Sequence, residues 1–413
     1  MLRLLAFLLL ISSFSLAAPG KPPIAANKPA KQNPLSARKK FALEVVQMAT
    51  ALPQPDPQDR LRVLSSAASV ARPLAQKTAQ QFASEAARIE SELVASGQQP
   101  AVSIFSTGMV DCATAANFVD SLPPASVERA ESSLLGAISS CPAQVGDSAR
   151  RKLEVALQVG VLAPRALLAM MERSGATSAW TQREFAAMFS SLPSDTGKAN
   201  SEAPNFAAMF NSMAPQIDKD TARDAGLHLL AWLGKVSASP ERNLAVNITT
   251  DTLKQILGDQ AYQEALRSDV EAQSAAATAG QPADITPPAE ESVSVLKAMN
   301  HVNTLPGTGP AEEMKDLPAS QRARQAAADG FAAGTSGKPA LASRYFDVAF
   351  AAADDVWSNR SPNNDAPAVL EEVAEAAANV NPVNALQRAQ HLQDSTAQAI
   401  AMLAIARVVV DQQ

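Results

Sequence analysis

The chain has 413 residues, of which 46% are hydrophobic, 4% aromatic and 18% charged, and its formal net charge is −6. Basic residues gather near its start, so residues 41–413 hold 28 basic and 41 acidic side chains, a net charge of −13. An acidic body repels phosphate backbones, which argues against nucleic acid as a partner.

The first 17 residues have the pattern of a secretory signal peptide. Arg3 precedes an apolar run, LLAFLLLISSFSL, and Ser15-Leu16-Ala17 has small residues at the two positions that a signal peptidase reads. We expect cleavage after Ala17 and a periplasmic or secreted product. The run is short for a bilayer span and no second stretch of about 18 apolar residues follows it, so the sequence predicts no transmembrane segment.

Residues 18–40 form a basic segment rich in Pro, Ala and Lys. The segment holds six positive charges, no acidic residue and no apolar period with which to bury itself. The sequence therefore predicts a disordered tail that acts as a solvated spacer. Such a tail could also touch an anionic envelope surface through weak, salt-sensitive attraction.

The rest of the chain is predicted to be all-α. Alanine supplies much of the hydrophobic fraction and favours helices, whereas β-branched and aromatic residues with a period of two are scarce. With 28 prolines, the helices should be short and frequently interrupted. Residues 193–204 and 271–290 are polar, lack an apolar period and are predicted to be loops or linkers. A linker at 271–292 would separate an N-terminal helical-repeat region, 41–270, from a C-terminal one, 293–413.

Helix-turn-helix units with one shared plan recur at 42–74, 117–140 and 205–236. In each unit a short apolar helix ends in Leu-Pro or Ala-Pro, and a polar turn with Asp or Ser follows. An Arg-bearing first turn then leads into a second apolar helix. Within this part of the chain, FAAMFSSLP from Phe185 and FAAMFNSMAP from Phe206 indicate a duplicated helix.

A related unit without the proline occupies 384–410. Asp394 and Ser395 offer side-chain oxygens to cap its second helix. Its apolar stripes are Leu386, Ala389 and Leu392 on the first helix and Ala397, Ile400, Leu403, Ala404 and Val408 on the second. Because neither stripe can be buried alone, the units are expected to stack as an irregular array.

This plan resembles that of tetratricopeptide-like α-helical repeat proteins, which are α-solenoids. The resemblance is one of pattern, because no unit carries the tetratricopeptide set of Trp, Leu-Gly, Tyr, Ala, Phe and Pro; here Leu233-Gly234 follows Trp232 on the second helix. It implies an irregular α-solenoid-like array of short helix-turn-helix units with a concave surface that binds a protein or peptide segment.

The sequence predicts no catalytic, cofactor-binding or metal-binding residues. His228, His301 and His391 are far apart, and none has a second His or Cys three or four residues away. Only His228 lies in a strongly apolar run, LHLLAW, where we expect a core or boundary position. The run AAGTSGKP is similar to a phosphate-binding loop, but Ala332 and Pro339 replace its required glycine and hydroxyl residue. We interpret it as a helix stop followed by a restart.

Adjacent acidic pairs occur at Glu312-Glu313, Asp354-Asp355 and Glu371-Glu372. Such a pair could supply the acid and the base of a hydrolase. Neighbouring residues on a helix point about 100° apart, however, so the pairs are interpreted as solvated faces.

Cys112 and Cys141 are the two cysteines of the chain, and an even count in an exported protein is more often paired than free. They lie at the ends of one predicted hairpin, whose turn is Pro123-Pro124. Equal helical rise from that turn would leave Cys141 about 10 Å beyond Cys112. A disulfide therefore requires that the returning helix bends or ends early, or that Cys112 precedes the first helical turn; two free thiols are the alternative.

Two functions from different classes remain open. One is an exported, non-catalytic helical-repeat scaffold that binds a protein or peptide partner in the cell envelope. The other is an envelope enzyme that hydrolyses glycan or peptide with carboxylates brought together only by the fold. Because repeats are present and clustered catalytic residue types are not, we expect the scaffold.

Overall fold

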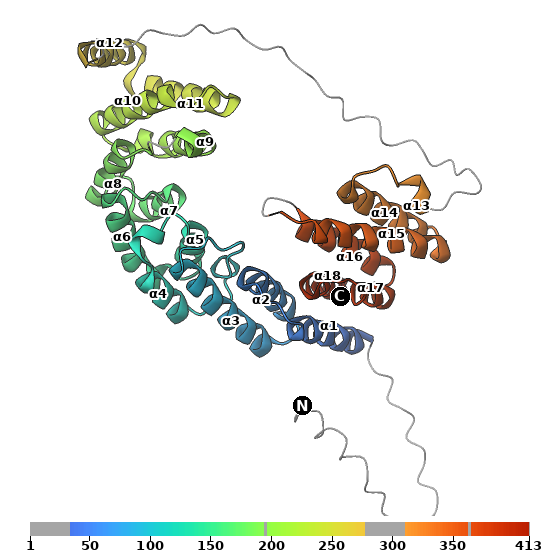
Figure 1. Ribbon diagram of the computed structural model, residues 1–413. Coiled ribbons are helices and arrows are strands. Elements are labelled where there is room, and N and C mark those ends of the chain that lie inside the picture. Colours follow the sequence, from blue (N-terminus) through green and yellow to red (C-terminus); the bar gives the residue numbers. More distant parts are fainter. Residues whose placement is uncertain (1–33, 194–195, 277–309, 362–364, 413) are drawn as a thin grey trace, which may run out of the picture.

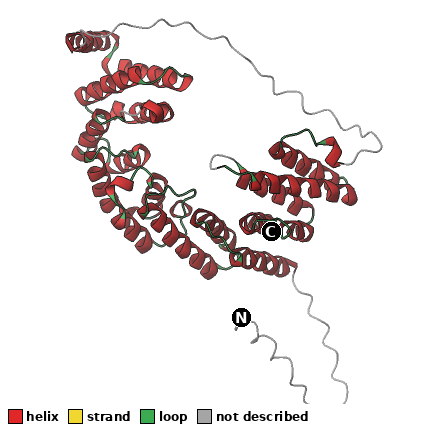
Figure 2. Ribbon diagram, viewed as in Figure 1, coloured by secondary structure: helices red, strands yellow, loops and turns green. Residues whose placement is uncertain are grey.

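The computed structural model describes residues 34–193, 196–276, 310–361 and 365–412. All regular elements within these ranges are helices and no strand occurs among them, as the composition predicts (Figure 2). The α-helices are α1 (Pro34–Ala51), α2 (Pro57–Ala71), α3 (Gln76–Ala95), α4 (Cys112–Ser121), α5 (Glu131–Ser140), α6 (Pro142–Gln158), α7 (Pro164–Ser174), α8 (Ala179–Ser190), α9 (Thr196–Met213), α10 (Lys219–Lys235), α11 (Pro240–Leu257), α12 (Asp259–Ala276), α13 (Pro310–Glu313), α14 (Ala319–Thr335), α15 (Pro339–Ser358), α16 (Ala366–Val380), α17 (Pro382–Ala389) and α18 (Ser395–Asp411). Short 3₁₀-helices are η1 (Phe105–Thr107), η2 (Pro124–Ser126) and η3 (Ala214–Gln216). The predicted signal peptide, 1–17, lies outside the described residues.

Prolines and aspartates set the helix boundaries of the three predicted hairpins. Helices α1, α4 and α9 each end two residues before a proline, at Pro53, Pro123 and Pro215. The residue before a proline is disfavoured in the α conformation, and Leu122 before Pro123 is accordingly extended; after α9, by contrast, the proline lies within the 3₁₀-helix η3. Asp56 and Asp218 then cap α2 and α10, because their carboxylates accept backbone N–H groups of the first turn.

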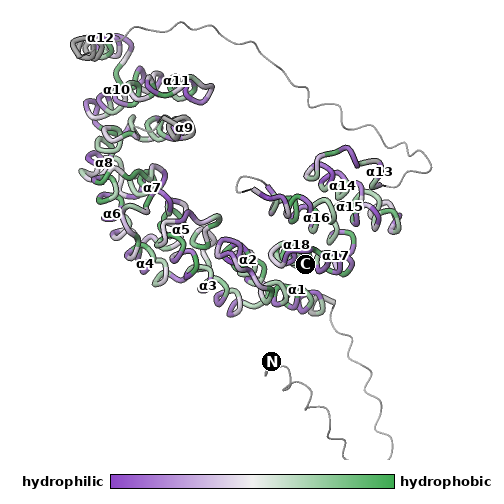
Figure 3. Tube along the Cα trace, viewed as in Figure 1, coloured by the Kyte–Doolittle hydropathy of each residue, from purple (hydrophilic) through white to green (hydrophobic). Residues whose placement is uncertain are grey.

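From α4 to α12, each helix packs against the next but one along the chain. One row contains α4, α6, α8, α10 and α12, and the other contains α5, α7, α9 and α11 (Figure 1). Hydrophobic and hydrophilic residues alternate around most helices, as helices buried on one side require (Figure 3). Both FAAMF segments are helical, on α8 and α9, and the rings of Phe189 and Phe210 meet edge to face at 5.6 Å.

A buried carboxylate and a close backbone approach hold α3, η1 and α5 together. Glu90 of α3 is fully buried; its Oε2 accepts the Ile104 N–H at 2.8 Å and its Oε1 accepts the Ser133 hydroxyl of α5. Burial raises the pKa of Glu90, while these two hydrogen bonds oppose the rise. Beside it, Gly136 on α5 lets the backbone of η1 come close, since a Cβ there would lie 2.4 Å from the Ser106 nitrogen.

Helix α2 is buried on two sides and joins two hydrophobic cores. Leu61 and Leu64 face the core that continues through α3–α12, whereas Val63 and Ala67 face a second core that contains α1 and α13–α18. Helix α18 packs against α1, α2 and α16. In space, the helices therefore run from α14 through α18 to α1 and α2, and from there to α12 (Figure 1).

The last helix is the most enclosed one in the second core. The five predicted stripe positions of α18 are all buried, but so are residues between them, including Ala399, Met402 and Ile405. The single apolar stripe predicted for this helix is thus too narrow, because α16 lies on one side of α18 and α1 on another. Asp394 caps α18 as predicted, whereas the Ser395 hydroxyl donates to the carbonyl of Pro53 at 2.5 Å.

Three segments predicted to be irregular are helical in part. Residues 34–40 of the predicted tail form the start of α1, residues 196–204 lie in α9 with Pro204 inside the helix, and residues 271–276 extend α12. The start of α1 is compatible with a helix, because Pro34 suits a first turn and Arg and Lys favour helices. It has no apolar period, since Ala37–Lys40 are exposed, and the sequence pattern therefore does not predict it. The remainder of the tail and of the linker lies outside the described residues.

Candidate functional site

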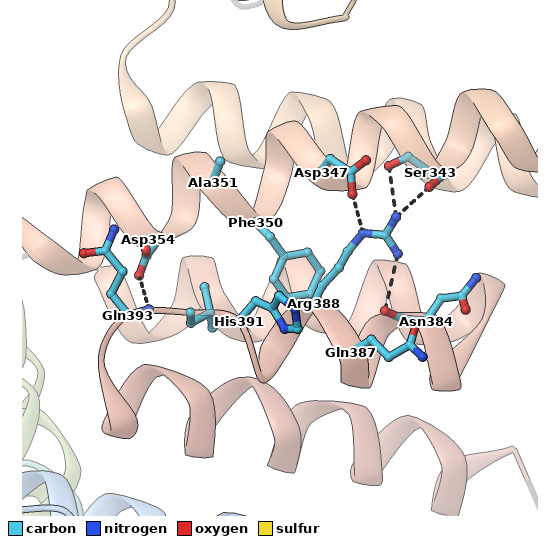
Figure 4. Close-up of a pocket in the computed structure, with 11 residues that line it drawn as sticks. Ser343, Asp347, Phe350, Ala351, Asp354, Asn384, Gln387, Arg388, His391 and Gln393 are labelled. Atoms are coloured by element: carbon cyan, nitrogen blue, oxygen red, sulfur yellow. Dashed lines mark hydrogen bonds and ion pairs between the residues drawn. The ribbon is translucent and has the colours of Figure 1, made fainter.

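A groove of about 800 Å³ lies between α15 and α17 (Figure 4). Its α15 side consists of Ser343, Asp347, Phe350, Ala351 and Asp354. Its other side consists of Asn384, Gln387, Arg388 and His391, followed by Leu392 and Gln393. Phe350 and Leu392 are each 5% exposed and form an apolar floor, while most of the remaining lining is polar. This volume lies within the usual range of ligand-binding clefts.

Arg388 ties the two sides of the groove together. Its Nε donates to Asp347 Oδ1 at 2.8 Å, and its Nη2 donates to the hydroxyl and the carbonyl of Ser343 at 2.7 and 3.2 Å. Its Nη1 donates to the carbonyl of Asn384 one turn earlier on α17, at 3.3 Å. The guanidinium is thus neutralised by Asp347 and largely occupied, which leaves little of it to bind an anionic ligand.

Asp354 supplies negative charge at the other end of the groove. Its Oδ1 accepts the backbone N–H of Gln393 at 3.4 Å, which is a long hydrogen bond. Partial burial raises the pKa of Asp354, and the nearby carboxylates of Asp355 and Asp394 raise it further. Arg322 forms an ion pair with the neighbouring Asp355 at 2.9 Å and therefore does not neutralise Asp354.

Four side chains of the groove keep free hydrogen-bonding groups. Within the described residues, no hydrogen bond engages the carboxamides of Asn384, Gln387 and Gln393 or the imidazole of His391. All four residues are exposed. Each carboxamide offers one acceptor oxygen and a donor NH₂ group, which together complement the C=O and N–H of a peptide bond.

The two cysteines meet, although the simple hairpin register predicts a gap between them. The structure joins Cys112 and Cys141 by a disulfide, with Cα atoms 5.3 Å apart. Helices α4 and α5 have ten residues each, because η2 and the turn at 127–130 delay the start of α5 until Glu131. Cys112, the first residue of α4, therefore lies opposite Cys141, the residue that follows α5.

The two histidines within the described residues, His228 and His391, lie in different parts of the fold. His228 lies on α10 and is exposed, so the core or boundary position predicted from its apolar neighbours is wrong. The neighbouring Leu229 and Trp232 are buried instead. His391 lines the groove, and His301 lies outside the described residues. No group of three or more potential metal ligands occurs among the residues that the structure describes.

The run AAGTSGKP forms a helix stop and restart, as predicted. Helix α14 ends at Thr335, Gly337 has a left-handed φ of +73°, and α15 begins at Pro339.

The acidic pairs divide between different partners. Glu371 pairs with Arg407 of α18, and Glu372 pairs with Arg324 of α14. Asp355 pairs with Arg322, while its neighbour Asp354 faces the groove. Neither Glu371-Glu372 nor Asp354-Asp355 presents both of its carboxylates to one ligand, as the angle of about 100° between adjacent helical positions predicts.

Sequence reasoning missed the groove itself. Asn384 and Gln387 lie on the side of α17 opposite its apolar stripe, His391 follows four residues later in the turn after the helix, and Asp347 and Asp354 lie two turns apart on α15. Those spacings were available in the sequence. They look the same as an ordinary solvated helix face, however, until the two helices are placed beside each other.

No protein-family model, curated protein or solved structure matches the chain. None of the helices in the described ranges combines the length and the apolar character needed to cross a membrane. The function is therefore inferred from the groove and from the packing of the helices.

Proposed function

We propose that the chain is an exported, non-catalytic scaffold of α-solenoid-like helical repeats that binds an extended peptide segment of a protein partner in the cell envelope. The groove between α15 and α17 is the proposed binding site. The observation that carries this proposal is the set of unengaged hydrogen-bonding groups along the groove, on Asn384, Gln387, His391 and Gln393.

The packing of the helices supports a scaffold. The alternate contacts from α4 to α12 are those of a two-row array, in which each hairpin buries its apolar faces only against its neighbours. Export rests on the sequence of residues 1–17.

The chemistry of the groove favours a peptide over a small anion. Because Arg388 is held by Asp347 and Ser343, the arginine of the groove is not free to bind phosphate or carboxylate. An extended peptide, by contrast, presents a C=O and an N–H at every residue and can pair with carboxamides on the rim. Phe350 and Leu392 provide apolar contact for its side chains.

The groove gives no specific observation in favour of hydrolysis. Asp347 and Asp354 are its two carboxylates, and seven residues on one helix place their Cα atoms about 10 Å apart along the axis. Asp347 is already bound by Arg388, which keeps it from serving as a free acid or base.

A displayed library of random 12-residue peptides, selected on the purified chain, tests the proposal. We expect enrichment of a sequence family whose binding is lost in the Asn384→Ala/Gln387→Ala double variant. Gln390→Ala is the matched control, because Gln390 is an exposed carboxamide on the same helical segment that does not line the groove. The proposal is overturned if no family is enriched, or if the double variant binds the enriched peptides as tightly as the unaltered chain.

A further inference from the structure

We infer that residues 18–33 of the same chain dock in the α15/α17 groove and compete there with partner peptides. The inference rests on the proposed function of the groove as a peptide-binding site. Its grounds are the chemistry of the segment, the charge of the groove and the distance between them.

The sequence of the segment suits a groove lined by hydrogen-bond donors. Residues 18–33 read APGKPPIAANKPAKQN, with four prolines, three lysines and no acidic residue. Proline-rich sequences favour the extended polyproline II conformation, so less conformational entropy is lost when they bind. A proline offers a carbonyl and no N–H, and the carboxamide NH₂ groups of Asn384, Gln387 and Gln393 are donors for such carbonyls.

The charges are complementary. The groove contains Asp347 and Asp354 against the single cation Arg388, and Asp394 lies close to Asp354. The carboxylate of Asp354 accepts one long hydrogen bond and, in the described residues, has no cationic partner. Residues 18–33 contain three lysines and no acidic residue. A Lys ammonium beside Asp354 would therefore reduce the repulsion between the carboxylates of Asp354 and Asp394.

The segment is long enough to reach the groove. Helix α1, which begins at Pro34, packs against α18, and α18 packs against α17. Two helix layers at 8–10 Å each separate α1 from the groove by about 20 Å. Sixteen residues at about 3.1 Å per residue span about 50 Å.

Covalent attachment makes weak complementarity sufficient. A short flexible tether produces an effective concentration on the order of 1 mM. A contact whose Kd is also about 1 mM would then occupy the groove in about half of the molecules. A partner peptide would bind with an apparent Kd about twofold higher than it does to an unoccupied groove.

Zero-length carbodiimide cross-linking of the full chain, at low protein concentration, tests the contact. The reagent joins a Lys amine to a carboxylate that touches it. We expect cross-links from Lys21 or Lys28 to Asp354 within single chains, and their loss in Asp354→Asn; Lys31, three residues before α1, is too close to the tether to reach. Asp251→Asn, at an exposed position of α11, is the control and should retain them.

Binding of a library-selected peptide provides the second measurement. A full-length variant with all three lysines changed to Gln should bind that peptide about twofold more tightly than the unaltered chain. The inference is overturned if the tail lysines cross-link evenly over the acidic body, if they cross-link only between two chains, or if the two affinities are equal. Those results leave the proposed function intact when the peptide still binds, whereas absence of peptide binding overturns the proposed function itself.

Discussion

Alanine substitutions at two helical glycines should change stability in opposite directions. Gly136 on α5 faces the backbone of η1, where an added Cβ would lie 2.4 Å from the Ser106 nitrogen and 2.6 Å from the carbonyl carbon of Phe105. Gly146 on α6 has no atom within 4 Å of the same built position. Both residues lie inside helices, so the difference between the two variants isolates the close approach of η1.

The magnitudes follow from two opposing terms. Replacing Gly by Ala inside a helix stabilises by about 0.5–1 kcal/mol, because the unfolded chain loses conformational freedom. Gly146→Ala should gain this amount. In Gly136→Ala the contact with Ser106 is backbone and cannot rotate away, and overpacking of this kind costs about 1–3 kcal/mol. Since the hydrogen bond from Ile104 to Glu90 also holds the segment before η1, we expect a net loss of about 1–2 kcal/mol.

Urea unfolding followed by far-UV circular dichroism measures both effects. The midpoint should rise for Gly146→Ala and fall for Gly136→Ala, with a difference of about 1.5–3 kcal/mol in the free energy of unfolding. Equal midpoints for the two variants would refute the close packing of η1 on α5. A gain in stability for Gly136→Ala would refute it more strongly.

Three further predictions concern the stability of the helices described above. Changing Cys112 and Cys141 together to Ser should lower the free energy of unfolding by about 3.5 kcal/mol in the loop-entropy model, since the bridged residues are 29 apart in sequence; an unchanged urea midpoint for the oxidised protein would contradict this. The pKa of Glu90 is raised in the folded state, so its contribution to stability is present below its unfolded pKa and is lost as pH rises through the folded pKa. The stability of Glu90→Gln relative to the unaltered chain should therefore increase from about pH 4 to pH 7. A difference that does not depend on pH in urea titrations would count against the raised pKa. Ile405→Ala, at a fully buried position of α18, should cost about 2–5 kcal/mol by the same assay, and a loss below 1 kcal/mol would show that α18 is not enclosed as described.

Helix boundaries were predictable because their causes are local. The proline after α1, after α4 and after α9 acts through the two adjacent residues, and Asp56, Asp218 and Asp394 cap helices within one turn of themselves. Where a helix is both exposed and polar, as at Ala37–Lys40, the apolar period disappears and the helix is missed. Pro204 shows the opposite case: it lies inside α9, although a proline in a polar segment predicts a loop.

Contacts between helices were not predictable in the same way. The stripe on α18 indicates that a face is buried but does not identify the helices that cover it, and one of these is α1, which is far away in the sequence. The groove depends on the same kind of information, since Asp347 and Arg388 meet only when α15 and α17 are adjacent. The cysteine pair lies between these cases: the hairpin was predictable, whereas the non-helical turn before Glu131 that brings its ends together was not.

The contact between α18 and the first two helices constrains the order in which the chain can fold. The hydrogen bond from Ser395 to Pro53 joins residues 342 apart in sequence, and the ion pair of Arg360 with Asp59 joins residues 301 apart. Closing a loop of that length costs about 2 kcal/mol more than closing a 30-residue hairpin. Hairpins such as α4–α5 can therefore form early, during or soon after synthesis, whereas the second core cannot close until α18 has been synthesised. Helix α1, which is synthesised long before α18, is thus buried only after α18 has been made, and its apolar face needs protection from aggregation for the whole of that interval.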